Sequence, residues 1–442
     1  LCLAACRPRR RCSARRHFGI DGGWGMMPVR VRVVVAVVLL AAWAVGAAAP
    51  PTVIWMAPFW SGGGYCSEAI DFVLAMQDAG LDVAIRHHGD SVDRGFVAGL
   101  DASTRSRLKA MENRFYSLPS TSSAIVVCHS EPGAWAPALY HTSECPPRSG
   151  AAVTIGRTMF ETDRLPDGWP PRLDRMDRIW VPTDHMKGIM APLVSKTIVE
   201  VVPEPVDTDW FRPDGPRMAR PGPCASASSV FLSIFKWEPR KAWDILVEAY
   251  AKEFAGDGDS VCLMILTHGY HSTTNDYAGE IGRVLREKHG LSPPETLVVL
   301  PEGLPNEQMP SLYRAADVFV LPSRGEGWGR PHVEAMACGI PIIATNWSGP
   351  TAFMTEANGY PLRYDGMDTI DGGAFQGHRW ARPSVDHLRT LMRLVHNDVH
   401  GRKAKGRQAR LDVVRYYAKD VLGNLLRQRI SQYAESTDRP EL

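Results

Sequence analysis

Residues 317–347 read DVFVLPSRGEGWGRPHVEAMACGIPIIATNW, and this stretch decides the class of fold. DVFVLPS is an apolar, strand-like run, and PIIATNW is a second one. Between them, Pro331 in the first turn and Gly339 just beyond the end bound a short helix. A strand, loop, helix and strand in this order are typical of a parallel sheet covered by helices. The loop SRGEGWGR therefore lies at the carboxyl end of a strand, where open α/β sheets bind ligands.

The same alternation runs through most of the chain. Short apolar runs such as PTVIWMAPF, SAIVVCH and VCLMILTHG alternate with segments of helical spacing such as SEAIDFVLAMQDAG and KAWDILVEAYAKEFAG. Continuous runs rich in Val and Ile favour strands that are buried on both faces. Clusters of Pro and Gly in residues 201–229 interrupt the rhythm, which then restarts. We predict an α/β fold of two facing Rossmann-like domains, each a doubly wound parallel sheet, with a ligand cleft between them.

The predicted organisation has four parts: a leader (1–50), an N-terminal domain (51–205), a C-terminal domain (206–385) and C-terminal helices (386–442). The chain has 442 residues, of which 45% are hydrophobic, and this is enough for two ordinary cores. Its formal net charge of +2 gives no reason to expect a nucleic-acid partner, which normally requires a basic face.

The leader carries a targeting signal in this interpretation. The first residues are rich in Arg and free of acids, which indicates either a transit-type leader or untranslated sequence. After Met26 and Met27, two arginines precede an apolar run at 33–49, which is either a cleaved signal peptide or a single-pass membrane anchor. We therefore expect the secretory pathway, in the endoplasmic reticulum or Golgi apparatus. The six cysteines beyond the leader lack a C-x-x-C pair, which argues against zinc, and several resemble small buried hydrophobes.

Two glutamates mark the loop and helix of the opening stretch. Glu326 lies among Gly325, Gly327 and Gly329, whose small size lets backbone N–H groups approach an anion. Glu334 lies one turn into the helix, where a carboxylate can accept hydrogen bonds from a vicinal diol. The alternative is an i,i+4 surface ion pair between Arg330 and Glu334.

SRGEGWGRPHVEAMACGIPIIATNWSG (323–349) closely resembles the glutamate-pair motif of retaining nucleotide-sugar glycosyltransferases of the GT-B, family-four (group 1) type. VVPEPVDTDWFRP, FKWEPRKAWDILVEAY and IVVCHSEP are similar to the family's interdomain, phosphate-binding and histidine-bearing segments, so the resemblance covers most of the chain. It implies transfer of a hexose from a nucleotide sugar to a glycan, lipid or small-molecule acceptor, with retention of configuration. The N-terminal domain would then bind the acceptor, and the C-terminal domain the donor.

The resemblance also implies a role for each matching residue. Glu326 would contact the donor hexose and Glu334 the ribose. Lys241, with Arg240 and Lys236, would neutralise the diphosphate and the leaving group. Lys236 matches the family's basic pair only after a shift of one residue, because Phe235 competes for the position. The alternative is a solvated basic turn.

The N-terminal domain supplies the remaining candidates. The resemblance would have His129 contact the donor sugar, although a lone His at a strand end is often structural. The loop with Gly62 and Gly63 would admit a phosphate or the acceptor, or would only make a tight turn. Arg157 and Glu161 are candidates for the acceptor side.

No metal ion and no cofactor beyond the nucleotide sugar are expected. Asp207-Thr208-Asp209 imitates a D-x-D metal motif, but it falls in the linker, so we predict a structural role. Two alternatives to a transferase stay open: a non-catalytic protein that binds nucleotide sugars or glycans, and an epimerase or phosphorylase with the same architecture.

Overall fold

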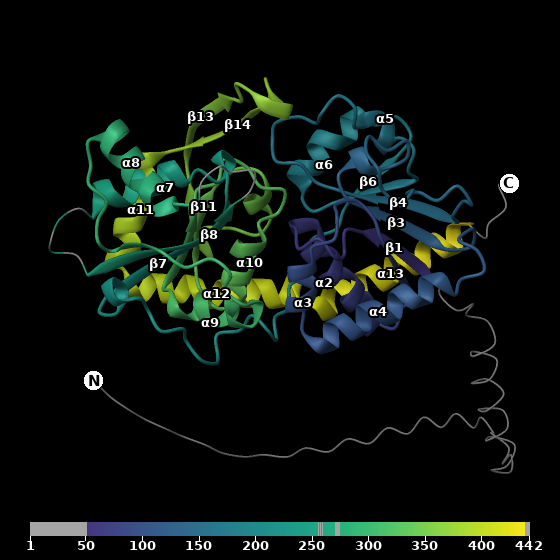
Figure 1. Cartoon of the computed structure of the whole chain (residues 1–442), viewed down its shortest axis with the longest axis horizontal. Coiled ribbons are helices and arrows are strands. Elements are labelled where there is room, and N and C mark those ends of the chain that lie inside the picture. Colours follow the sequence, from purple (N-terminus) through teal and green to yellow (C-terminus); the bar gives the residue numbers. More distant parts are fainter. Residues whose placement is uncertain (1–50, 255, 257, 259, 270–274, 438–442) are drawn as a thin grey trace, which may run out of the picture. The chain divides into compact units, whose positions relative to one another are not determined.

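Two parallel sheets of six strands each organise the chain (Figure 1). The computed structural model describes residues 51–254, 256, 258, 260–269 and 275–437. The predicted leader therefore lies outside the described residues. Within the described part of the chain, no helix is both long and apolar enough to cross a membrane. The predicted doubly wound α/β architecture is confirmed.

The first sheet has the strand order β2-β1-β3-β4-β5-β6. Its strands are β1 (Val53–Ala57), β2 (Val83–His87), β3 (Ile125–His129), β4 (Val153–Arg157), β5 (Arg178–Val181) and β6 (Ile198–Val201). Its helices are α2 (Gly64–Asp78), α3 (Arg94–Gly99), α4 (Ala102–Tyr116), α5 (Pro170–Leu173) and α6 (Asp184–Met190). The order reverses beside β1, so the loops after β1 and β3 border the crevice where such sheets bind ligands.

Strand β1 shows why continuous apolar runs form the centre of this sheet. All five of its residues are buried. Val53 and Trp55 face one core, whereas Ile54 and Met56 face a second core on the other side of the sheet. Alternating side chains point to opposite faces of a strand, so a strand covered on both faces must be apolar throughout.

The second sheet has the order β12-β11-β10-β7-β8-β9. Its strands are β7 (Ser229–Trp237), β8 (Val261–Gly269), β9 (Leu297–Val299), β10 (Val318–Leu321), β11 (Ile342–Thr345) and β12 (Gly359–Leu362). Its helices are α7 (Trp243–Glu253), α8 (Tyr277–His289), α9 (Met309–Ala315) and α10 (Arg330–Ala337). Here the order reverses between β7 and β10, which places the loops after these two strands side by side.

The C-terminal helices are divided between the two cores. They are α11 (Val385–Asn397), α12 (Val399–Tyr417) and α13 (Lys419–Thr437). Leu388 of α11 and Val413 of α12 lie in the core of the second sheet. Leu426 and Ile430 of α13 lie in a core of the first sheet, and Figure 1 shows α13 beside α2. The chain therefore returns to its first half at the end, which the sequence did not predict.

A hairpin of β13 (Tyr364–Thr369) and β14 (Arg379–Pro383) is a further unpredicted element. It reaches residues of the first half: Arg379 Nε donates to Asp163 at 2.9 Å, and the ring of Phe375 lies 5.0 Å from that of Phe160. The hairpin therefore joins the half that contains the second sheet to the loop that follows β4.

The cysteines differ from the prediction. Cys128 forms a disulfide with Cys145, and Cys224 forms one with Cys262. Cys66 and Cys338 are free and buried, as expected for small hydrophobes. No pairing was predicted because the partners are 17 and 38 residues apart and only the fold brings them together.

Candidate active site

An ion-paired cluster lies where the loops after β7 and β10 meet. Lys241 Nζ donates to both carboxylate oxygens of Glu326, at 2.7 and 2.8 Å. Arg240 Nη1 donates to the same carboxylate at 3.1 Å and to the carbonyl oxygen of Gly325 at 2.8 Å. These loops flank the reversal point of the sheet, so the cluster occupies the position at which doubly wound sheets bind ligands.

The charge of Glu326 is held by its neighbours. Its side chain is 7% exposed, and burial alone would raise its pKa. The charges of Lys241 and Arg240 outweigh burial and lower the pKa of Glu326 to about 2. Glu326 is therefore ionised at neutral pH, and its carboxylate pairs with both cations.

The backbone before α7 is strained beside this cluster. Ala242 has φ 50° and ψ 39°, the left-handed conformation that L-residues rarely adopt, and it is fully buried. It directly follows Lys241 and is the N-cap residue of α7. Such strain persists only where the surroundings enforce it, and it concentrates at functional sites.

Lys236 lies in β7 itself, whereas Arg240 and Lys241 lie in the following loop. Burial lowers the pKa of Lys236, and the charges of Glu238, Lys241 and Arg240 also act on it. The structure thus brings all three predicted cations into one neighbourhood.

Glu334 is buried on α10 and accepts a hydrogen bond from the hydroxyl of Tyr313 at 2.8 Å. Arg330 Nη2 lies 3.9 Å from Glu334, but its closer partners are Asp71 and Glu204. The i,i+4 pair between Arg330 and Glu334 is therefore present, but Arg330 also joins α10 to α2 of the first half. Burial raises the pKa of Glu334. The recess that it lines with Pro205 and Val206 is too tight for a water molecule.

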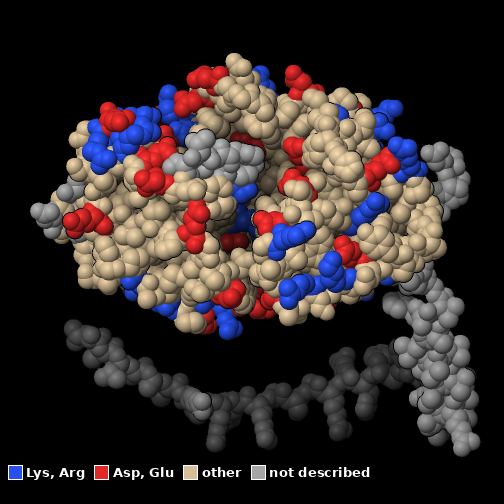
Figure 2. Space-filling view, in the orientation of Figure 1, with Lys and Arg blue, Asp and Glu red and all other residues tan. Residues whose placement is uncertain are grey.

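The glycines of the loop permit close approach of the two halves. A Cβ on Gly325 would overlap the carbonyl oxygen of Glu161, and one on Gly327 would overlap the side chain of Met159. Glu161 also lies 3.7 Å from Arg240, and burial raises its pKa. In this structure Gly325 and Gly327 therefore face the loop after β4. Figure 2 shows a hollow in this face of the molecule, with basic and acidic side chains at its floor.

His129 is fully buried at the end of β3. Trp55 Nε1 donates to its Nδ1 at 3.0 Å, so Nδ1 is the acceptor and Nε2 carries the proton. Nε2 lies 3.1 Å from Glu68 Oε2, to which it donates. Burial lowers the pKa of His129, in keeping with a neutral ring. Both nitrogens are used within the protein, so the expected contact with a sugar is not available in this arrangement.

Arg157 is also fully buried, and it contacts the same Glu68. Its Nε donates to Glu68 Oε1 at 2.7 Å, and its Nη1 donates to the carbonyl oxygen of Val202 at 2.5 Å. This burial does not fit a position on the acceptor side, since no part of Arg157 faces solvent. Burial would raise the pKa of Glu68, but Arg157 and His129 lower it to about 2. The sequence analysis missed Glu68; its only signal was an acid within an otherwise apolar helix face.

The glycines after β1 begin α2. Gly62 has φ +74°, a conformation that favours glycine, and it packs against Phe96. Gly63 precedes the first turn of α2, and its N–H donates to Ser61 Oγ at 3.3 Å. Gly62 and Gly63 therefore form the turn between β1 and α2, next to the reversal point of the first sheet.

The D-x-D lookalike has local partners. Asp207 Oδ1 accepts the N–H groups of Asp209 and Trp210 at 3.1 and 2.8 Å, and Oδ2 pairs with Lys419 at 2.9 Å. Asp207 therefore folds the linker and ties it to α13. Among the described residues, no group of three or more His, Cys, Asp and Glu side chains is placed to hold a metal ion.

Comparison with known proteins gives a consistent result. Residues 228–367 match the family described as Glycosyl transferases group 1. The chain is similar to a D-inositol 3-phosphate glycosyltransferase of Mycobacterium tuberculosis, with 30% identity over 226 residues, 50% of this chain and 42% of that protein. It is also similar to a GDP-mannose-dependent alpha-(1-6)-phosphatidylinositol monomannoside mannosyltransferase of Mycolicibacterium smegmatis, with 29% identity over 160 residues, 34% of this chain and 39% of that protein. The chain thus spans about half or less of the length of these two relatives.

Solved structures share the fold at low identity. Anabaena Alr3699/HepE in complex with UDP has a TM-score of 0.62 and 13% identity, covering 86% of this chain and 100% of that chain. A sucrose-phosphate synthase from Thermosynechococcus elongatus has a TM-score of 0.61 and 13% identity, covering 87% and 100%.

These findings correct the predicted location. Relatives that match the chain come from bacteria, which have no endoplasmic reticulum or Golgi apparatus, and no described helix could span a membrane. The prediction of a location in the endoplasmic reticulum or Golgi apparatus is therefore wrong. The apolar run on which it rested lies outside the described residues. Residues 228–367 are a glycosyl transferases group 1 domain, in a chain with the GT-B fold.

Proposed function

We propose that this protein transfers a hexose from a nucleotide sugar to a hydroxyl-bearing acceptor, with retention of anomeric configuration and without a metal ion. The observation that carries the proposal is the cluster of Lys241, Arg240 and Glu326 at the reversal point of the second sheet. It lies within the residues that match the glycosyl transferases group 1 family. The activity named for the relatives is sugar transfer, which supports the same reaction class here.

In this proposal the cations bind the diphosphate of the donor. Arg240 and Lys241 each have Glu326 as a partner in the free protein, so an incoming diphosphate replaces or shares that carboxylate. Lys236 adds a third charge nearby. The cations then stabilise the negative charge that develops on the leaving diphosphate, which is the largest electrostatic demand of the reaction.

Glu326 would act on the transferred hexose, and Glu334 on the ribose. A carboxylate whose pKa is about 2 is a poor nucleophile, so Glu326 is proposed to accept hydrogen bonds from sugar hydroxyls and not to form a covalent intermediate. Glu334 would exchange its bond from Tyr313 for bonds from ribose hydroxyls. The acceptor proton would pass to an oxygen of the leaving phosphate, on the face from which the diphosphate departs.

The halves would cooperate in excluding water. The loop after β4 meets the glycine loop at Gly325, and Arg330 pairs with Asp71 across the two halves. Exclusion of water limits hydrolysis of the donor and strengthens the electrostatic interactions of the site. In this proposal the acceptor, whether glycan, lipid or small molecule, would enter from the first half.

The test incubates the purified protein with a panel of nucleotide sugars and candidate acceptors, and identifies the products by mass spectrometry and by the anomeric coupling in NMR. A new glycoside with retained configuration supports the proposal. An epimerised nucleotide sugar, a reaction that requires inorganic phosphate, or binding without turnover would each identify one of the alternatives.

A matched pair of variants ties the activity to the site. Lys241→Met should lower turnover by roughly 10²- to 10³-fold, the effect of losing one preorganised stabilising group. Lys252→Met removes a lysine from the exposed side of α7, where it pairs with Glu248 and with no other acid of the described residues, and should leave turnover unchanged. Equal activity of the two variants would contradict the proposed role of Lys241 in catalysis.

A further inference from the structure

A cavity lies at the opposite edge of the second sheet from the ion-paired cluster. Its volume is about 180 Å³. Asp317, which directly precedes β10, lines it together with Cys338 and Pro341 of the segment between α10 and β11. Both strands therefore begin at the cavity and end at the proposed donor site, about 13 Å away along a strand of four residues.

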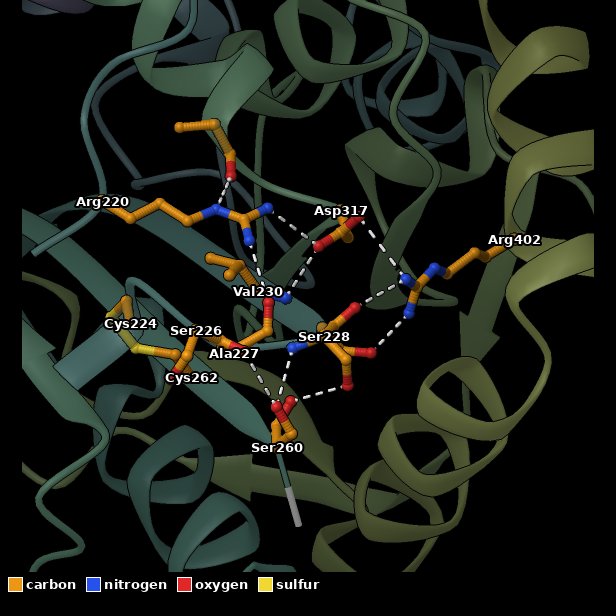
Figure 3. A network of polar contacts seen from close by, with 12 residues as sticks. Arg220, Cys224, Ser226, Ala227, Ser228, Val230, Ser260, Cys262, Asp317 and Arg402 are labelled. Carbon is orange, nitrogen blue, oxygen red and sulfur yellow. Dashed lines mark hydrogen bonds and ion pairs between the residues drawn. A yellow bond between two sulfur atoms is a disulfide. The ribbon is translucent and has the colours of Figure 1, made fainter.

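The cavity wall carries more positive than negative charge. Its ionisable lining consists of Arg217, Arg314, Arg402, Lys403 and a single acid, Asp317. That acid is already neutralised. Its carboxylate pairs with Arg220 at 3.2 Å and with Arg402 at 3.5 Å, and it accepts the N–H of Val230 at 3.0 Å (Figure 3).

Arg314 brings a nearly buried guanidinium to this wall, with 8% of the residue exposed. Its Nε donates to the carbonyl oxygen of Pro216 at 2.8 Å, and its Nη1 donates to that of Arg212 at 3.1 Å. Within the described part of the chain, Nη2 has no hydrogen-bond acceptor and no carboxylate lies within ion-pair distance of the group. A buried charge without a counter-ion is costly, and the guanidinium keeps donors available.

Arg217 and Lys403 extend the same pattern to the mouth of the cavity. Both are exposed, and among the residues that the structure describes no carboxylate pairs with either. Arg217 comes from the linker and Lys403 from α12, so the cations converge from different segments of the chain. Convergence of this kind is what a bound anion would stabilise.

We propose that this cavity is a second ligand site, which binds the phosphate group of a small metabolite or inorganic phosphate. Arginine donors in a fixed fork match the oxygens of phosphate, and lysine adds an adaptable point charge. A space of this size takes a cluster of several water molecules, so it admits a phosphate with a small organic group. It is distinct from the diphosphate site proposed above and does not depend on the transferase reaction.

The site has a direct structural route to the rest of the domain. A phosphate held by Arg314 and Lys403 would connect α9 and the linker to α12. The same ligand would contact residues 338–341, which directly follow α10. Glu334 lies on α10. Binding should therefore stabilise the second half as a unit, since a ligand that binds only the folded state raises its stability.

The experiment titrates the intact protein with inorganic phosphate and with a hexose monophosphate, by calorimetry and thermal unfolding, at constant ionic strength set with chloride. We expect saturable binding and a higher unfolding temperature. Arg217→Ala and Lys403→Ala should each weaken binding by roughly threefold to tenfold, the effect of one partly exposed charge on an anion. Arg407→Ala removes an exposed cation of the same helix outside the cavity lining, and should bind like the unaltered protein.

Lys241→Ala separates this site from the donor site. The proposal requires phosphate binding to persist in that variant. If Lys241→Ala abolishes binding while the two cavity variants retain it, the anion binds at the donor site and the proposal is wrong. Absence of saturable binding in the unaltered protein would also overturn it. Tighter binding of the hexose phosphate than of inorganic phosphate would identify a metabolite as the ligand, and equal binding would identify phosphate alone.

Discussion

Replacing Glu326 by Gln should destabilise the folded protein in a way that depends on pH. The variant keeps the shape of the side chain but removes the charge that pairs with Lys241 and Arg240. In the native protein the pKa of Glu326 falls from its ordinary 4.5 to about 2. A fall of this size corresponds to about 3 kcal/mol of folding free energy at neutral pH. Lys241 then loses the carboxylate to which its ammonium group donates, whereas Arg240 keeps Glu238 at 2.7 Å. Breaking one such nearly buried pair gives a cost of the same order, about 3–5 kcal/mol.

The sign of the pH dependence follows from the lowered pKa. An acid that is more readily ionised in the folded state stabilises that state above its unfolded pKa of about 4.5. This contribution is lost as the pH falls from about 4.5 through about 2, below which Glu326 is protonated in both states. The difference in unfolding free energy between the native protein and Glu326→Gln should therefore be largest above about pH 5 and should shrink below it.

Urea unfolding followed by tryptophan fluorescence at several pH values measures this difference. Glu356→Gln is a matched control, because Glu356 is exposed and forms no ion pair among the described residues. It should change stability by less than about 0.5 kcal/mol. A difference in unfolding free energy between Glu326→Gln and the native protein that is zero or independent of pH would contradict this reasoning. Either result would show that the ion pairs do not lower the pKa of Glu326.

Three further predictions concern the proposed site. Glu334→Ala should weaken binding of free nucleoside diphosphate by about 1–3 kcal/mol, because hydrogen bonds to a carboxylate are lost; calorimetry showing unchanged affinity would exclude a ribose contact. Gly325→Ala should lower the unfolding temperature and turnover, since its Cβ would overlap the backbone of Glu161, whereas Gly64→Ala meets nothing within 4 Å and should be neutral in packing. Activity should persist in excess EDTA; its loss, with recovery on adding manganese, would contradict charge neutralisation by side chains alone.

The sequence predicted the repeating units of the fold well. The helix after the glycine loop was expected from Pro331 to Gly339, and α10 spans Arg330–Ala337 with Gly339 at φ +76°. Local signals sufficed there because helix ends depend on neighbouring residues. The same holds for β1, whose apolar run needs only burial on both faces.

Contacts between distant residues could not be predicted in this way. His129 and Glu68 are 61 residues apart, and only the pairing of β3 with β1 and the packing of α2 bring them together. Strand β13 has no buried residue. Its sequence therefore shows no alternation of apolar and polar residues, and the β13–β14 hairpin was not predicted. Glu326 could be predicted as a site residue because it belongs to a local sequence motif. Its ion pairs with Arg240 and Lys241 could not be predicted, because they depend on β7 and β10 being neighbours in the sheet.

The free protein uses Glu326 as the counter-ion of the cations that the proposed donor would need. Two cations at the reversal point of the sheet would be costly if unpaired, and the carboxylate of Glu326 lowers that cost. A diphosphate carries the same sign and can take over both cations. Glu326 is then released from them next to the phosphate that carries the hexose. In the proposed reaction, one exchange of partners thus binds the leaving group and frees the carboxylate for the sugar, and the same pairs that stabilise the fold prepare the site for its substrate.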